Sequence, residues 1–398
     1  MNRSKVEREA AKWKEEGIIS ERQYRQIVER YQPGNNSFLL AIFAGLFIGL
    51  GFLTFIASNW DVIPPEGKMV IILFFVTAFY LTGHVSYERR SKSIGIAFML
   101  IGLLTFGAGI FLTGQMYHFA FFSAVPFVIW ALAATALFAI YPYPVLYVSA
   151  IAIVTIGQLY SGFVYSDFNI WLLLILVLVL GHYTYHRARF LYGYLFVVSF
   201  ILQSLVWVAV EQSQYYWLLV PLLLIYTVGE LAGKTSLKRS FINMSLIAAF
   251  SLNIFQAFFL GNGYLRSELE FGLGFPIFWS VLIIFVLWLK SRKRNAFHFV
   301  DLALFIPVFY IPFGDMVAML LLFVYSIGVL LHGYEEERQE SIVSGTIAFL
   351  ISTLIAYIHF VWDFLDKSIF FFTGGVLLFV LSFLLERKRR NVQKGGGS

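Results

Sequence analysis

The residues that could do chemistry in this chain are polar side chains set within long apolar runs. The clearest group is "GQMYH" at 114–118. In a continuous helix Gln115 and His118, three residues apart, would share one face and could hold one hydrogen-bonding group. His118 would also respond to protonation near neutral pH, whereas Tyr117 points elsewhere and fits an anchor at the membrane interface. This stretch is therefore a candidate wall of a binding cavity.

Further polar residues lie within or beside other apolar runs. Gln203, Trp207 and Glu211 fall at i, i+4 and i+8 of one predicted helix, and Asn253 and Gln256 share a face of another. The full set of candidate substrate-binding residues is Gln115, His118, Tyr117, Asn59, Trp60, Asp61, Gln158, Gln203, Glu211, Asn253 and Gln256.

Several kinds of chemistry are excluded or disfavoured by the sequence. The chain has no Cys, so disulfides, thiolate catalysis and Cys-ligated metals are ruled out. It has no phosphate-binding glycine loop, no metal-spaced His and Glu cluster and no nucleophile-elbow Ser. We therefore assign no catalytic residue, no metal and no cofactor, expect no nucleic-acid partner, and favour a non-enzymatic activity.

The elements that must position these residues are membrane-spanning helices. Apolar residues make up 59% of the 398 residues and charged residues 13%, against roughly 25% charge in a soluble protein. A spanning helix needs about 20 mainly apolar residues, and about fourteen such runs are present. They start near Phe38, Lys68, Ser93, Phe121, Tyr143, Asn169, Phe190, Tyr215, Phe241, Phe271, Phe297, Met316, Ile342 and Ile369. The predicted fold is an all-α polytopic bundle of these helices.

Lys and Arg predict the orientation of the bundle. With the N-terminus in the cytoplasm, all of the 29 Lys and Arg fall on the cytoplasmic side except Lys68, Arg266 and Lys367. This bias follows the positive-inside rule, so we expect both termini in the cytoplasm. The turn "YPYP" (141–144) carries no charge, and the helices on either side of it could instead form a re-entrant pair, as could those around "IPFGD" (311–315).

In this orientation the candidate substrate-binding residues lie in the outer half or at the outer rim of the membrane. The inner half has fewer polar groups, among them Glu230, Asn243 and Asp301. Polar groups in the hydrocarbon region are costly unless they face the bundle interior or water, so their shared depth predicts a cavity that opens outward. The alternative is that they form hydrogen bonds between helices, worth about 0.6 kcal/mol each.

A short polar head precedes the bundle. Residues 1–37 are predicted to form two amphipathic helices in the cytoplasm, with Gly17 as the C-terminal cap of the first. Ser20 and Gln23 form a capping box for the second. Two such helices bury little apolar surface alone. The head therefore either lies on the membrane or, through residues 1–32, docks on a cytoplasmic protein or a second copy of the chain.

The bundle itself is predicted to cover residues 38–390. A shift of 177 residues brings several predicted helix starts into register, which would give an inverted repeat with halves 38–212 and 213–390, as in many secondary transporters. Chance alignment of similar helices is the competing explanation. Residues 391–398 form a tail, and its final "GGGS" resembles an appended linker.

Four stretches together resemble a known family. They are "WKEEGIISERQY" (13–24), "ASNWDVIPPEGK" (57–68), "FGAGIFLTGQMYHF" (106–119) and "FFFTGGVLLFVLSFLLERKRR" (370–390). The chain resembles the bacterial multi-pass membrane family catalogued as domain of unknown function 2157. The resemblance implies a protein of the bacterial inner membrane and carries no activity over. It marks Asn59, Trp60, Asp61, Gln115, Tyr117 and His118 as family-like polar positions.

Three functional interpretations remain open. The first is a transporter or flippase for a lipid-linked or amphiphilic envelope molecule, which fits the helix number, the short loops and the outward cavity. The second is a non-transporting sensor or assembly partner that acts through the head. The third is an intramembrane glycosyltransferase-like enzyme with Asp61 as its carboxylate, although the outer loops are short for such an enzyme. Membrane lipids are expected partners in each case.

Overall fold

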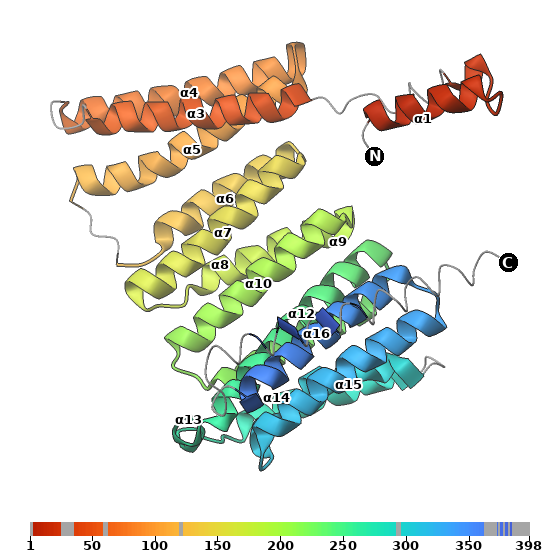
Figure 1. The fold of residues 1–398 in the computed structure, drawn as a ribbon. Helices are drawn as coiled ribbons and strands as arrows, with labels where there is room; N and C mark the ends of the chain where they lie inside the picture. Colours follow the sequence, from red (N-terminus) through yellow and green to blue (C-terminus); the bar gives the residue numbers. More distant parts are fainter. Residues whose placement is uncertain are drawn as a thin grey trace. The chain divides into compact units, whose positions relative to one another are not determined.

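The structure is a computed structural model, and it describes residues 3–24, 36–58, 63–118, 122–291 and 296–361, with a few single residues beyond 361. Every regular element within these ranges is helical (Figure 1), which confirms the predicted all-α polytopic bundle. The chain divides into two compact units, Met1–Leu146 and Tyr147–Ser398. We call them the N-terminal and C-terminal units and describe each by itself.

The N-terminal unit is built on one central helix. Its helices are α1 (Arg3–Glu15), α3 (Asn36–Ser58), α4 (Pro65–Arg89), α5 (Lys92–Met116) and α6 (Val125–Ile140). Helices α3, α4 and α6 all pack against α5. Small residues allow this close packing: the ring of Trp130 lies where a Cβ on Gly107 would be, and its Nε1 donates a hydrogen bond to the Leu103 carbonyl at 2.9 Å.

The caps predicted for the head are confirmed. Helix α1 ends before Gly17, which has a positive φ of 74°. The side chain of Gln23 accepts a hydrogen bond from the Ser20 amide at 2.9 Å, while the Ser20 hydroxyl accepts one from the Gln23 amide at 3.3 Å. This reciprocal pair is a capping box. Residues 25–35 lie outside the described residues.

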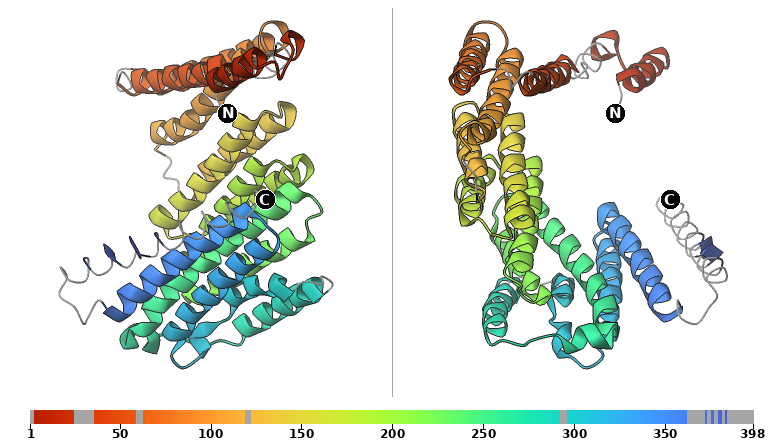
Figure 2. Two further views of the ribbon diagram at one scale, coloured as in Figure 1. Left: turned by 45° about the vertical axis from the view of Figure 1, so that its right-hand side comes forward. Right: turned by 90° about the vertical axis from the view of Figure 1, so that its left-hand side faces the viewer.

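The C-terminal unit contains most of the helices. They are α7 (Pro144–Tyr165), α8 (Ile170–Leu174), the π-helix η2 (Ile175–Leu180), α9 (Gly181–Arg187), α10 (Phe190–Val210), the 3-10 helix η3 (Tyr215–Leu218), α11 (Leu219–Leu231), α12 (Thr235–Gly261), α13 (Gly263–Ser267), α14 (Gly274–Ser291), the 3-10 helices η4 (Ala296–Phe305) and η5 (Val308–Tyr310), α15 (Gly314–Glu335) and α16 (Gln339–Val361). Figure 2 shows α15 and α16 side by side in both views, and they pack along their length.

Most of the predicted spans are present as helices. Nine helices of the described residues are long and apolar enough to cross a membrane, and two shorter apolar helices cover 125–140 and 215–231. Helix α3 covers the run predicted near Phe38. The run near Ile369 falls outside the continuous described ranges. The run near Phe297 differs from the prediction, because its backbone forms 3-10 helix and not α-helix.

Pro307 explains where this 3-10 segment breaks. It separates η4 from η5 and has no N–H to donate to the Leu304 carbonyl, as a 3-10 pattern would require. Side chains of neighbouring helices satisfy the carbonyls at this break: Asn253 Nδ2 donates to Leu304 at 2.7 Å, and Trp279 Nε1 donates to Phe305 at 2.9 Å. Every backbone polar group needs a hydrogen-bond partner in a membrane, and these two side chains supply partners for the carbonyls of the irregular backbone.

The core of the C-terminal unit surrounds this broken segment. Helices α11, α12, α14 and α15 contribute its buried side chains together with η4 and η5. The rings of Tyr216 and Phe309 stack with centroids 4.3 Å apart, and Phe275 packs edge-on against both. The 3-10 segment is thus the centre of a packed helix cluster.

Candidate functional site

The most concentrated chemistry in the C-terminal unit is a buried ammonium group between two carboxylates. Lys290 lies in the last turn of α14, and its side chain is only 1% exposed. Its Nζ lies 3.4 Å from Asp301 Oδ2 and 3.8 Å from Glu230 Oε1. Asp301 belongs to η4 and Glu230 to the end of α11. One cation therefore joins α14 and the following η4 to α11, which is distant in the sequence.

Each carboxylate has a second partner besides Lys290. The Tyr226 hydroxyl donates a hydrogen bond to Asp301 Oδ2 at 2.8 Å. Lys238, in the first turns of α12, places Nζ 3.6 Å from Glu230 Oε2. We call Tyr226, Glu230, Lys238, Lys290 and Asp301 the charged network. Because each carboxylate is held twice, Lys290 can strengthen its contact with either one without leaving the other alone.

Local structure places these groups together. Tyr226 and Glu230 are four residues apart on α11 and so share one face. Lys290 lies beside that face, with Nζ 5.2 Å from the centre of the Tyr226 ring. Gly328 of α15 lets η4 come close, because a Cβ at that position would lie 2.3 Å from a methyl group of Val300, the neighbour of Asp301.

The charged side chains of the network differ in how deeply they are buried. The side chains of Lys290 and Glu230 are 1% and 5% exposed, whereas Lys238 is 40% exposed. Buried ions are strongly unfavourable unless they are paired, and two cations facing two anions make the network formally neutral. In the predicted orientation it lies at the cytoplasmic end of the bundle. This arrangement can hold the ends of α11, α12, α14 and η4 together.

The candidate residues of the N-terminal unit lie at the end of α5. Gln115, Tyr117 and His118 are all exposed. Helix α5 ends at Met116, and His118 has a left-handed backbone with φ 55°. The shared helical face expected for Gln115 and His118 therefore does not extend to His118, because the backbone turns at Tyr117. Asn59, Trp60 and Asp61 lie outside the described residues.

The candidate residues of the C-terminal unit are of three kinds: buried amides bonded to backbone groups, one exposed carboxylate, and buried amides without a partner among the described residues. Gln158 is buried. With the oxygen and nitrogen of its side-chain amide exchanged, it donates to the backbone carbonyl of Asn169 at 3.0 Å and accepts from the backbone N–H of Asn169 at 3.2 Å. Asn253 supports the broken segment as described above. Glu211 is exposed and caps α10.

Gln203 and Gln256 form the third kind. Both are buried, and neither amide oxygen nor amide nitrogen has a hydrogen-bond partner among the described residues. Such groups are open to a ligand or to water.

The sequence indicates only part of the charged network. It predicts Glu230 and Asp301 as polar groups of the inner half, whereas Lys290 belongs to the cytoplasmic cations that predict the orientation. A Lys at the end of an apolar helix normally extends its ammonium to the interface, so its burial was not foreseeable from position. The one available signal was the pair of inner-half carboxylates, which require a cation if they are buried.

A metal site is not indicated by this geometry. Within the ranges that the structure describes, no group of three His, Asp or Glu could hold a metal ion. The charged network offers two carboxylates, and the Lys290 ammonium occupies the space between them.

Comparison with known proteins finds a family match for part of the chain. Residues 11–147 match the sequence profile of the family described as Predicted membrane protein (DUF2157), which confirms the resemblance seen in the sequence. The matched stretch covers nearly all of the N-terminal unit. No curated protein and no solved structure matches the chain. The family description and the nine apolar helices of the described residues together identify the chain as a multi-pass membrane protein. Its own geometry is the basis for the activity proposed below.

Proposed function

We propose that the chain is a transporter that moves a lipid-linked or amphiphilic envelope molecule across the bacterial inner membrane, with the charged network as its cytoplasmic gate. The observation that carries the proposal is the burial of Lys290 between Glu230 and Asp301, because ionisable groups buried in membrane spans usually mark transport pathways. The distribution of Lys and Arg supports a cytoplasmic position for both termini.

The gate closes the predicted cytoplasmic end by joining four elements through charge. Moving η4 away would take Asp301 from both Lys290 and the Tyr226 hydroxyl in a medium of low dielectric, so the closed state is favoured. The second partners, Tyr226 for Asp301 and Lys238 for Glu230, lower the cost of moving Lys290 from one carboxylate to the other. Such an exchange of partners provides two defined states for a gate.

The broken segment supplies the moving part of this proposal. Runs of 3-10 helix longer than three or four residues are uncommon and often mark a hinge, and η4 has 10 residues. Discontinuous helices form the sites of many secondary transporters. Movement of η4 would carry Asp301 away from Lys290 and so open the network.

A gate closed toward the cytoplasm accords with a binding cavity that opens outward. We propose that the polar residues of the outer half contact the substrate, with Gln203 and Gln256 as buried amides that have hydrogen bonds left to offer. We propose separately that transport depends on Gln115 and His118, the exposed polar residues at the end of α5 in the N-terminal unit. Changing both, Gln115→Leu with His118→Phe, should abolish transport while the protein still inserts and folds. Unchanged transport would remove these two residues from the proposal.

The experiment that tests transport uses fluorescent lipid in vesicles. The purified full chain is reconstituted into phosphatidylethanolamine and phosphatidylglycerol vesicles that carry NBD-labelled phosphatidylglycerol, and dithionite reports how fast the label changes leaflet. We expect a rate at least about tenfold above protein-free vesicles, equivalent to about 1.4 kcal/mol of barrier. A rate equal to that of protein-free vesicles contradicts transport of a lipid-like molecule.

A matched pair of variants assigns the activity to the gate. Lys290→Met should return the rate to that of protein-free vesicles. Arg266→Met removes a cation that also contacts the chain near the broken segment, through a bond to the Ile311 carbonyl at 3.0 Å, but lies outside the network. It should retain the wild-type rate. Equal loss in both variants would contradict a specific role of the network.

A further inference from the structure

The face of α11 that points away from the charged network carries a second feature. Tyr226 and Glu230 lie on one face of this helix, while Leu224, Val228 and Leu231 lie on another and line a groove. We propose that this groove binds one anionic phospholipid from the cytoplasmic leaflet, with an acyl chain inside the groove and the phosphate at its basic mouth. The proposal needs the chain to be in a membrane but does not rest on transport.

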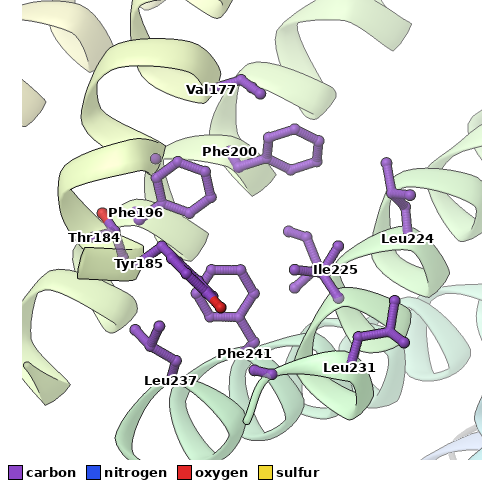
Figure 3. Close-up of a pocket in the computed structure, with 13 residues that line it drawn as sticks. Val177, Thr184, Tyr185, Phe196, Phe200, Leu224, Ile225, Leu231, Leu237 and Phe241 are labelled. Atoms are coloured by element: carbon purple, nitrogen blue, oxygen red, sulfur yellow. The ribbon is translucent and has the colours of Figure 1, made fainter. Parts of the chain in front are cut away.

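The groove has a suitable size and shape. Its volume is about 510 Å³, within the range of small-molecule sites. Helices α9 and α10 and the π-helix η2 form one wall, and α11 and α12 form the other. In Figure 3 the side chains of Tyr185, Phe196 and Phe200 stand across from Ile225 and Leu231. The occupant therefore lies between two groups of helices.

The lining selects a hydrocarbon chain. The polar side-chain groups in the lining are the hydroxyls of Thr184 and Tyr185. The Thr184 hydroxyl is already bonded to the Tyr147 hydroxyl at 2.6 Å and to the Leu180 carbonyl at 2.7 Å. Leu224 and Leu231 remain 42% and 55% exposed, so apolar surface is left for a ligand to cover.

A basic mouth lies at the predicted cytoplasmic end of the groove. Lys234 follows closely after the lining residue Ala232, and its Nζ lies 5.0 Å from the ring centre of Tyr185. This ammonium donates to the carbonyls of Tyr185 at 2.8 Å and His186 at 3.2 Å. Since an ammonium has three donors, one remains for a phosphate oxygen.

Arg187 and Arg189 add to the positive charge at this mouth. Arg187 is the last residue of α9 and Arg189 follows it in the short link to α10, which is tied to α12 by a hydrogen bond from the Ser236 hydroxyl to the Ala188 carbonyl. Within the described chain, neither arginine nor Lys234 forms an ion pair with an acidic side chain. Basic pockets between helices on the cytoplasmic side bind anionic lipid head groups, and an apolar groove that continues from the mouth distinguishes a phospholipid from free phosphate.

A second groove in the same unit offers a built-in control. It lies between α7 and α10, has a volume of about 500 Å³, and is lined by apolar residues that include Leu159 and Leu205. The polar residues in its lining are Ser166 and Gln212, and neither is cationic. Leu205 is 44% exposed, close to the 42% of Leu224. The two grooves thus match in size and apolar lining and differ in the charge at the mouth and in the predicted side of the membrane.

Native mass spectrometry of the full chain in detergent tests the proposal. The probes are palmitoyl-oleoyl phosphatidylglycerol and phosphatidylcholine, titrated separately. We expect one phosphatidylglycerol per chain, bound at least about tenfold more tightly than phosphatidylcholine, because three basic side chains near the head group attract its negative charge. Inorganic phosphate titrated alone should bind no more tightly than phosphatidylcholine.

Two variants locate the lipid. Leu224→Trp fills the groove and should lower phosphatidylglycerol affinity at least about tenfold, whereas Leu205→Trp in the control groove should leave it unchanged. Arg187 is exposed, and Arg187→Gln should lower phosphatidylglycerol affinity about fivefold. Equal affinity for the two lipids, or equal effects of the two Trp substitutions, would overturn the proposal. Tight binding of phosphate alone would identify an anion site without a lipid.

Discussion

The polar groups of the C-terminal unit are organised in two different ways. In the charged network, charged side chains come from four elements, and each lies within 4 Å of at least one opposite charge. The amides of the predicted outer half are neutral and are used one at a time: Gln158 pairs with the backbone of Asn169, and Asn253 supports η4. Gln203 and Gln256 are buried with no partner among the described residues.

The difference follows from the cost of burial. A buried charge without a partner is strongly destabilising, so ions inside a membrane protein have to converge. A buried amide without a partner costs far less, and a single backbone group can satisfy it. Convergence is therefore expected of the charges and not of the amides. This supports the network as the proposed gate and leaves Gln203 and Gln256 available for a ligand.

The largest expected effect is the loss of the shared cation. Lys290→Met leaves the carboxylates of Glu230 and Asp301 close together and should lower the free energy of unfolding by about 3–5 kcal/mol. Unfolding of the detergent-solubilised protein by a denaturing detergent, followed by circular dichroism, measures the change. A loss below about 1 kcal/mol would mean that solvent screens the network as it does a surface ion pair.

Removing all three charges should reverse this loss. Lys290→Met combined with Glu230→Gln and Asp301→Asn leaves no uncompensated buried ion, and well-packed neutral replacements of buried pairs are often neutral in stability. The triple variant should therefore unfold at nearly the wild-type denaturant concentration. Instability equal to that of Lys290→Met would show that packing of the Lys side chain, and not charge, holds the elements.

A smaller effect is expected where α15 approaches η4. Gly328→Ala places a Cβ against Val300 and should lower the free energy of unfolding by about 1–3 kcal/mol, the usual cost of overpacking. Gly51→Ala is the control, because a Cβ on Gly51 of α3 meets no atom within 4 Å. It should leave stability unchanged or raise it by about 0.5–1 kcal/mol. Equal effects in the two variants would contradict close packing of η4.

The smallest effects on stability are expected at the two buried amides of α12, Asn253 and Gln256, and they should differ between the two residues. Asn253→Leu removes the donor to the Leu304 carbonyl and should cost about 1–3 kcal/mol, because that carbonyl is left unsatisfied. Gln256→Leu breaks no bond among the described residues and should be neutral or slightly stabilising. Thermal unfolding of both variants in one detergent tests this order. The reverse order would mean that Gln256 has a structural partner and is not free for a ligand.

Much of the fold was predictable because membrane helices depend on simple rules. Apolar runs of about 20 residues gave the spans, and local capping chemistry gave Gly17 and the Ser20–Gln23 pair. The 3-10 segment was not predictable. Pro307 marks a break, but the side chains that stabilise it, Asn253 and Trp279, come from helices distant in the sequence.

The candidate site was harder to predict than the fold. Depth in the membrane can be estimated from the sequence, and it selected Gln203, Gln256 and their neighbours. Whether side chains at one depth meet depends on helix rotation and packing, which apolar sequence does not encode strongly. Lys290 illustrates the limit, because only the packing of α11 against α14 turns it from an interfacial cation into a buried one.

The central claim is that the charged network closes the cytoplasmic end of the bundle, and cysteine accessibility tests it most directly. The chain has no Cys, so Ser245→Cys introduces a single thiol. Ser245 is 0% exposed and bonds the Leu222 carbonyl of α11 at 2.6 Å, two turns farther along α12 than Lys238. Ser352→Cys, at a 1% exposed position of α16, is the control for unfolding.

A membrane-impermeant thiol reagent is added to the cytoplasmic side of inside-out vesicles, with and without Lys290→Met. We predict that Cys at 245 reacts slowly when Lys290 is present and at least about tenfold faster when it is replaced, since a tenfold change needs a shift of only about 1.4 kcal/mol in the opening equilibrium. Cys at 352 should stay unreactive in both backgrounds. Equally slow labelling at 245 with and without Lys290 would contradict the gate.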